Sequence, residues 1–132
     1  MRLWHKDLIP YLPKQQLLGQ WRECCCIAKN IHDKGTPNHI LVNKIMDYPI
    51  EHFFRYGYRV WKEMRSRQYN VDWNKFSKWF NNMSSEYAED KLYATWHNDR
   101  YLLQCLYNLQ EKYDCGGISE EEWCRINEFQ RG

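Results

Sequence analysis

Apolar residues recur at helical spacing along most of this chain. From residue 13 to about residue 30, leucine, tryptophan and cysteine follow one another every three or four positions. Pro13 suits the first turn of a helix, where its missing amide hydrogen would have no partner in any case. The stretch KNIHDKGTPN then breaks the pattern. We therefore predict a helix over residues 13–30.

Two more helices are predicted on either side of Pro49. The stretch HILVNKIMDY, residues 39–48, predicts a short helix, which ends there because proline disfavours helical geometry in the residue before it. Residues 50–67 place apolar side chains on one helical face and a basic stripe on another. This stripe consists of Arg55, Arg59 and Lys62.

The second half of the chain has the same helical character. A short apolar-periodic segment surrounds Phe76, and a longer one runs from about residue 89 to residue 113. Ser119, followed three residues later by Glu122, has the spacing of a capping box and predicts the start of a last helix. No alternating strand pattern of useful length and no repeat occurs. The predicted fold is all-α, a single compact domain over residues 1–132 with five or six helices.

Charge is distributed unevenly along the 132 residues. Residues 1–78 hold 14 Lys and Arg against 7 Asp and Glu, whereas residues 79–132 hold 5 against 10. A basic half of this kind favours a polyanionic partner on one face, although a solvated surface would have the same composition. No apolar run reaches the roughly 18 residues that a membrane span needs. We expect a soluble, cytoplasmic monomer.

Six cysteines raise the question of disulfides or a metal. Cys24, Cys25 and Cys26 are consecutive, so on one helix their side chains point in different directions and cannot be joined as a set. A zinc site with His32 or His39 would lack the usual C-x2-C pair. We predict reduced thiols, no metal and no cofactor.

Polar side chains form two adjacent stripes on the first predicted helix. Positions seven apart nearly eclipse on a helix, so Gln15 aligns with Arg22 and Gln16 with Glu23. From this helix alone, a functional face and a solvated face are both consistent with the pattern.

The first residues of the chain, taken together, favour a functional face over a solvated one. The letters MRL, then Gln15, Leu17 and WRE at residues 21–23, resemble the endonuclease V-type pyrimidine-dimer DNA glycosylases. A weaker similarity follows in FFRYGYRVWKEMRSRQYNV, so the resemblance covers about the first 70 residues. It implies a DNA repair enzyme that cleaves the glycosidic bond of a damaged nucleotide and then the strand, acting on double-stranded damaged DNA.

The resemblance also implies a mechanism. The nucleophile of these enzymes is the α-amino group of the N-terminal residue, which forms a Schiff base with the deoxyribose that collapses by β-elimination. An α-amine has a reference pKa of about 8, so part of it is neutral at physiological pH. The bulky Arg2 predicts that the initiator residue is retained, which makes the amine of Met1 the nucleophile. By resemblance Glu23 is the acid/base, and Arg2 and Arg22 bind the phosphates that flank the lesion.

We expect the remaining DNA contacts to come from polar and basic side chains on the first and third predicted helices. These are Gln15, Gln16, Arg55, Arg59 and Lys62. The Met1 amine should lie beside Glu23 and Arg22, at the floor of a basic concave surface that the Arg55 stripe helps to form. The chain departs from the family at Gln16, where the family has histidine, and at Cys26, where it often has arginine.

Two other functions compete with a glycosylase that also cleaves abasic sites. A non-catalytic DNA-binding protein would keep the basic half of the chain without the amine chemistry. A helical protein-interaction module would have no salt-sensitive affinity for DNA.

Overall fold

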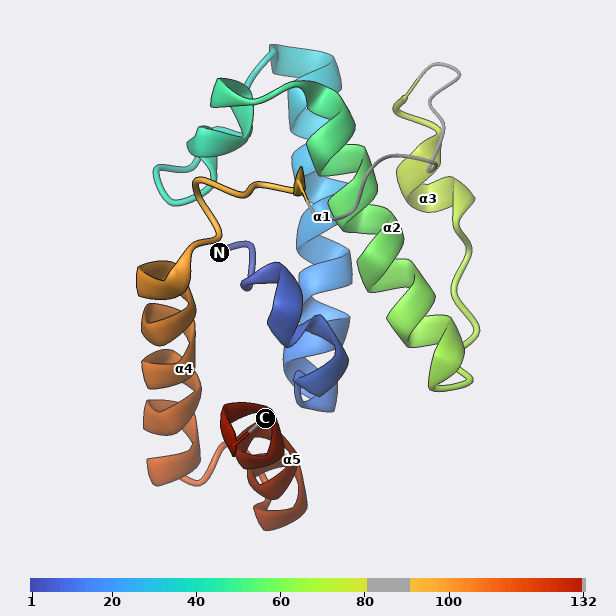
Figure 1. Ribbon diagram of the computed structural model, residues 1–132. Helices are drawn as coiled ribbons and strands as arrows, with labels where there is room; N and C mark the ends of the chain where they lie inside the picture. Colours follow the sequence, from blue (N-terminus) through green and yellow to red (C-terminus); the bar gives the residue numbers. More distant parts are fainter. Residues whose placement is uncertain (81–90, 132) are drawn as a thin grey trace.

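The computed structural model describes residues 1–80 and 91–131, and these residues form helices joined by turns, without a β-strand. The prediction of an all-α, compact fold is confirmed. In this part of the chain, two short 3-10 helices, η1 and η2, accompany five α-helices (Figure 1). Their bounds are η1 Lys6–Tyr11, α1 Lys14–Lys34, η2 Asn43–Asp47, α2 Ile50–Ser66, α3 Asn74–Ser77, α4 Asp99–Asp114 and α5 Glu120–Arg131.

Helices α1 and α2 lie side by side and form the centre of the molecule (Figure 1). The predicted first helix is confirmed and continues to Lys34. It ends at Gly35, whose φ of 75° is the left-handed conformation that glycine adopts without steric cost. The fully buried side chains of Leu17, Cys24 and Ile27 face the core.

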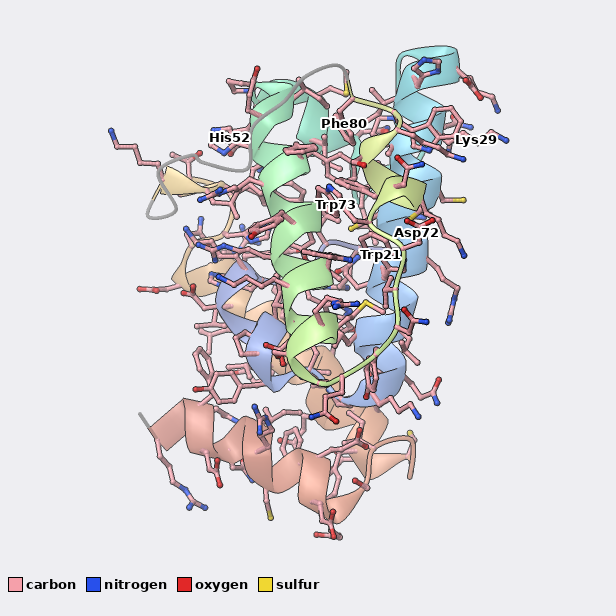
Figure 2. The ribbon with its side chains drawn as sticks, turned by 90° about the vertical axis from the view of Figure 1, so that its right-hand side faces the viewer. Trp21, Lys29, His52, Asp72, Trp73 and Phe80 are labelled. Atoms are coloured by element: carbon pink, nitrogen blue, oxygen red, sulfur yellow. The ribbon has the colours of Figure 1, made fainter. Side chains whose placement is uncertain are left out.

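An aromatic cluster fills the space around α1, α2 and α3 (Figure 2). The rings of Trp21 and Trp73 stack with their centroids 6.4 Å apart. Gly57 lets α2 approach this cluster closely, because a Cβ there would lie only 2.3 Å from the Phe76 ring. Burial of so many rings is a large source of stability, and it fixes the relative position of the two central helices.

The chain start and the last helix pack against each other. Arg125 Nη2 donates to the Pro10 carbonyl oxygen at 3.1 Å, and the Lys14 amide donates to Glu122 Oε2 at 2.9 Å. The predicted capping box is confirmed, since the Glu122 amide donates to Ser119 Oγ and the Ser119 amide to Glu122 Oε1, both at 3.2 Å. The 3-10 helix η1 was not predicted from the sequence pattern.

Two predicted helices are wrong in part. Only Asn43–Asp47 of the segment 39–48 is helical, as the 3-10 helix η2. The helix expected over residues 89–113 begins only at Asp99, where Asn98 Oδ1 accepts the Tyr101 amide at 3.0 Å as an N-terminal cap. Residues 91–98 instead form irregular turns, with Tyr93 at a φ of 50°, while residues 89 and 90 lie outside the described part of the chain.

None of the described helices is both long and apolar enough to cross a membrane. All six cysteines lie in the described residues and are free thiols. Burial raises the pKa of Cys25 to about 11 and that of Cys24 well above its usual range. These two thiols therefore stay protonated at neutral pH.

Two buried histidines attach the chain start to the turns before α4. The Lys6 amide donates to His97 Nδ1 at 2.9 Å, and His5 Nε2 donates to the His97 carbonyl oxygen at 2.9 Å. The Asp7 amide donates to His5 Nδ1 at 3.1 Å, so His5 is a structural cap of η1 in its neutral form. Burial lowers the pKa of His97 to about 2 and also lowers the pKa of His5.

We predict that acid weakens the fold through His97. An unfolded histidine takes up its proton near pH 6.5, whereas folded His97 stays neutral to about pH 2. The unfolded chain thus binds more protons as the pH falls below 6.5, and stability present above that pH is progressively lost. His97 alone should lower the free energy of unfolding by about 2 kcal/mol between pH 7.5 and pH 5.

Urea titrations of His97→Asn at the two pH values test this expectation, because asparagine can still accept the Lys6 amide but cannot titrate. The variant should lose about 2 kcal/mol less than the wild type on acidification. His32→Asn, at an exposed histidine, should keep the wild-type loss. The same pH dependence in all three proteins would contradict the assignment.

Candidate active site

The first four residues form a non-helical segment that a buried glutamine holds against α1. Gln20 is almost fully buried, and its side-chain amide pairs with the backbone of the segment at two points. The Trp4 amide donates to Gln20 Oε1 at 2.8 Å, and Gln20 Nε2 donates to the Arg2 carbonyl oxygen at 2.9 Å. This pairing fixes the position of the segment along the axis of α1.

Two tyrosine hydroxyls complete the anchoring. Tyr56 of α2 lies 2.6 Å from the Trp4 carbonyl oxygen and 2.9 Å from Gln20 Oε1, and can donate to either. Tyr101 of α4 donates to the Leu3 carbonyl oxygen. Burial raises the pKa of both tyrosines, so both keep the proton that they donate. Three consecutive carbonyl groups are thus held from three different helices.

This anchoring places Met1 in a hollow between α1 and α4, where Figure 1 marks the N-terminus. We call this hollow the Met1 pocket; its volume is about 270 Å³. Its lining comes from four parts of the chain: Met1, Arg2 and Trp4, Glu23 of α1, Leu41 before η2, and Asn108 and Lys112 of α4. Met1, the acidic residue Glu23 and two basic residues therefore line one small concave site.

The two ionic residues next to Met1 are restrained by their neighbours. Glu23 is half-buried, and its Oε2 lies 3.4 Å from Gln20 Nε2. The Arg2 guanidinium lies over the Trp4 ring at 5.5 Å and beside the Tyr101 hydroxyl. Gln20 consequently contacts both the acidic residue and the backbone that leads to the amine.

Arg22 faces a second hollow, on a different face of α1. We call it the Trp21 pocket; it has a volume of about 480 Å³, and Trp21 and Trp79 form part of its wall. Four exposed basic side chains line it: Arg22, Lys29, Lys75 and Lys78. Figure 2 shows Lys29 at the outer edge of α1. Arg22 and Glu23 are adjacent in sequence but line different pockets, because successive residues of a helix point about 100° apart.

The basic stripe of α2 is not part of the Met1 pocket. Arg55 is only 6% exposed, within the core side of the helix. Arg59 and Lys62 line a separate hollow of about 290 Å³ together with Lys6. The concave surface around Met1 is formed by α1, α4 and the turn before η2 instead.

The two predicted glutamines both lie about two helical turns before Glu23 along α1. Gln15 is exposed. Gln16 is half-buried, and its Oε1 has no hydrogen-bond partner among the described residues. Among the described residues, neither makes a hydrogen bond to the chain start as Gln20 does.

The sequence analysis did not identify Gln20, Asn108 or Lys112. Gln20 carries a recognisable signal, because it is a polar residue on the helical face of Leu17 and Cys24 that otherwise enters the core. The α4 residues carry none, since nothing in the sequence indicates that α4 lies against the chain start.

The model of the family described as pyrimidine dimer DNA glycosylase matches residues 1–77. No curated protein and no solved structure matches the chain. The matched segment contains Met1, Gln20, Glu23 and Tyr56, whereas Tyr101 and the other α4 residues of the site lie outside it.

Proposed function

Since the chain belongs to the pyrimidine dimer DNA glycosylase family, we propose that it removes damaged pyrimidines from duplex DNA and cleaves the resulting abasic site, with the Met1 amine as the nucleophile. One observation carries this proposal: Met1 and Glu23, from different parts of the fold, line the same 270 Å³ pocket. An amine and a carboxylate at one site are the two groups that Schiff-base chemistry on a sugar needs.

In the proposed reaction the nitrogen lone pair of Met1 forms a bond to C1′ of the deoxyribose. The bond from C1′ to the base breaks, and the base leaves with the bonding electrons and takes up a proton. Opening of the sugar ring gives a protonated imine between Met1 and C1′. Loss of a proton from C2′ then forms a C2′–C3′ double bond and releases the 3′-phosphate, which breaks the strand.

Glu23 is proposed to serve both halves of this sequence. Its carboxylate offsets the positive charge that develops on the sugar and the imine, and it moves the protons that ring opening and elimination require. Gln20 is a positioning residue, because it contacts Glu23 Oε2 and holds the backbone of Arg2 and Trp4. The buried Gln20 side chain therefore positions both Glu23 and the segment that carries the Met1 amine.

Phosphates of the damaged strand are proposed to contact Arg2 and Lys112 at the Met1 pocket and Arg22 at the Trp21 pocket. The four exposed basic residues of the Trp21 pocket continue this contact along α1 and α3. A DNA-binding protein without catalysis would use the same cations, so basic charge alone does not separate the two functions. Arg55 is left out of the proposed interface because it is buried.

Borohydride trapping on an abasic duplex tests the proposal. Borohydride reduces an imine to a stable amine, so the enzyme should become covalently joined to the DNA and migrate as a larger species in a denaturing gel. A duplex with a thymine dimer should be trapped in the same way if that lesion is the substrate. Salt-sensitive DNA binding without any trapped complex would leave the non-catalytic function instead.

A further inference from the structure

The turn before η2 presents two apolar side chains to solvent. Ile40 is 86% exposed and Leu41 is 51% exposed, whereas the next residue, Val42, is fully buried. Isolated exposed hydrophobics are common, but two adjacent ones at a protruding turn form an apolar tip. We call Ile40 and Leu41 the apolar tip.

Hydrogen bonds on both sides of the apolar tip hold it rigidly. The His39 amide donates to Asn43 Oδ1 at 3.0 Å, and the Leu41 amide donates to His39 Nδ1 at 3.2 Å. The His39 carbonyl oxygen accepts the amides of Val42 and Asn43 at 3.0 and 2.8 Å. These bonds and the buried Val42 already order the backbone of the turn. Little further conformational entropy of the backbone is therefore lost when the two exposed apolar side chains bind a partner.

The apolar tip lies at the rim of the Met1 pocket. Leu41 lines that pocket together with Met1 and Glu23, and it also lines two adjoining hollows of about 260 and 250 Å³. Ile40 lines the second of these. Two more exposed apolar side chains, Met1 and Tyr107, lie around the same hollows. A strand whose sugar enters the Met1 pocket therefore lies close to the apolar tip.

The charge around the apolar tip selects a polyanion as its partner. Among the described residues, the three hollows contain one acidic side chain, Glu23, and four basic ones. The basic residues are Arg2, Lys44, Arg100 and Lys112. An apolar protrusion surrounded by cations is suited to DNA, whose phosphates bind the cations while the stacked bases accept an apolar side chain.

We propose that Ile40 and Leu41 insert into the base stack beside the lesion and hold the duplex open while the lesion's C1′ reaches the Met1 amine. This inference rests on the proposed function. In an intact duplex the base stack keeps C1′ away from a protein nucleophile, so the strand must bend and one stacking step must open. Apolar side chains that enter the open step replace part of the lost stacking and stabilise the bent form.

The test compares duplex with single-stranded DNA. Ile40→Ala/Leu41→Ala is measured by borohydride trapping on an abasic duplex and on the same abasic strand alone, which has no paired stack to open. The double variant should be trapped about tenfold more slowly than the wild type on the duplex, because two apolar side chains no longer enter the base stack, and its loss on the single strand should be much smaller.

Two further variants serve as controls. Leu103→Ala removes the same side chain from α4 at the same 51% exposure and should match the wild type on both substrates. Ile40→Leu/Leu41→Ile keeps the apolar volume and should restore trapping on the duplex. Equal losses of Ile40→Ala/Leu41→Ala on both substrates would make Leu41 a wall of the Met1 pocket and overturn the insertion.

A reading that does not depend on catalysis completes the test. A 2-aminopurine placed next to the abasic site gains fluorescence when it is unstacked, so wild type should raise the signal on binding and the double alanine variant should not. The fluorescence comparison remains informative even if the wild type traps no DNA. That outcome would contradict the proposed enzymatic activity but not the insertion. A rise of the same size with both proteins would overturn the insertion alone.

Discussion

Replacing Glu23 with glutamine is expected to abolish strand cleavage at an abasic site while DNA binding stays as tight or becomes tighter. Glutamine has the same shape and can still accept the hydrogen bond from Gln20 Nε2, so the Met1 pocket should keep its form. It cannot carry the negative charge or move a proton. The cleavage rate should fall by at least about 100-fold, the usual contribution of a positioned acid or base.

Cleavage of an end-labelled abasic duplex measures the rate, and fluorescence anisotropy measures the affinity. Glu111→Gln is the matched control, because it removes the same charge from an exposed position of α4 next to Lys112. It should cleave at the wild-type rate. If Glu23→Gln also cleaves at a comparable rate, Glu23 has no role in the chemistry.

Blocking the Met1 amine is expected to stop trapping almost completely. Acetylation turns the amine into an amide, whose lone pair is delocalised and cannot attack C1′. The acetyl group is small, so the anchoring of residues 2–4 should survive the modification. Protein with its native start, acetylated protein and protein with an N-terminal extension are compared on an abasic duplex with borohydride present.

A lysine is the alternative nucleophile, and the structure indicates which one to examine. Lys112 is the lysine among the described residues that lines the Met1 pocket, whereas Lys6 lines the separate hollow beside α2. Lys112→Arg removes the primary amine and keeps the charge, so it should still be trapped. Equal trapping of all three N-terminal forms, combined with loss in Lys112→Arg, would transfer the role from Met1 to Lys112.

The parts of the fold that could be predicted are those with strong local signals. Helices α1, α2 and α5 combine regular apolar spacing with a clear start or stop, such as Pro13 or the Ser119 capping box. The turns at residues 91–98 could not be predicted, because Leu92 and Trp96 have helical spacing but are buried in an irregular segment. Their conformation depends on contacts with distant parts of the chain, including the bond between Lys6 and His97.

The candidate site, like the fold, could be predicted only in part. The Met1 and Glu23 pair was implied by the family resemblance of a short motif near the chain start, and both residues line one pocket in the structure. Arg55 shows why helical periodicity alone does not predict which side chains of a central helix are exposed. Helix α2 is packed against η1 and η2 as well as α1, so a face that is polar in the pattern can still lie in the interior.

The three anchored carbonyls of residues 2–4 have a consequence for rate. A chain terminus ordinarily frays, and a nucleophile on it would have to be ordered each time substrate binds. Here the hydrogen bonds from Gln20, Tyr56 and Tyr101 order the segment when the protein folds. If the Met1 amine is the nucleophile, as we propose, folding already orders the segment that carries it. The amine would then lose little orientational entropy at each turnover and would meet C1′ at a high effective molarity.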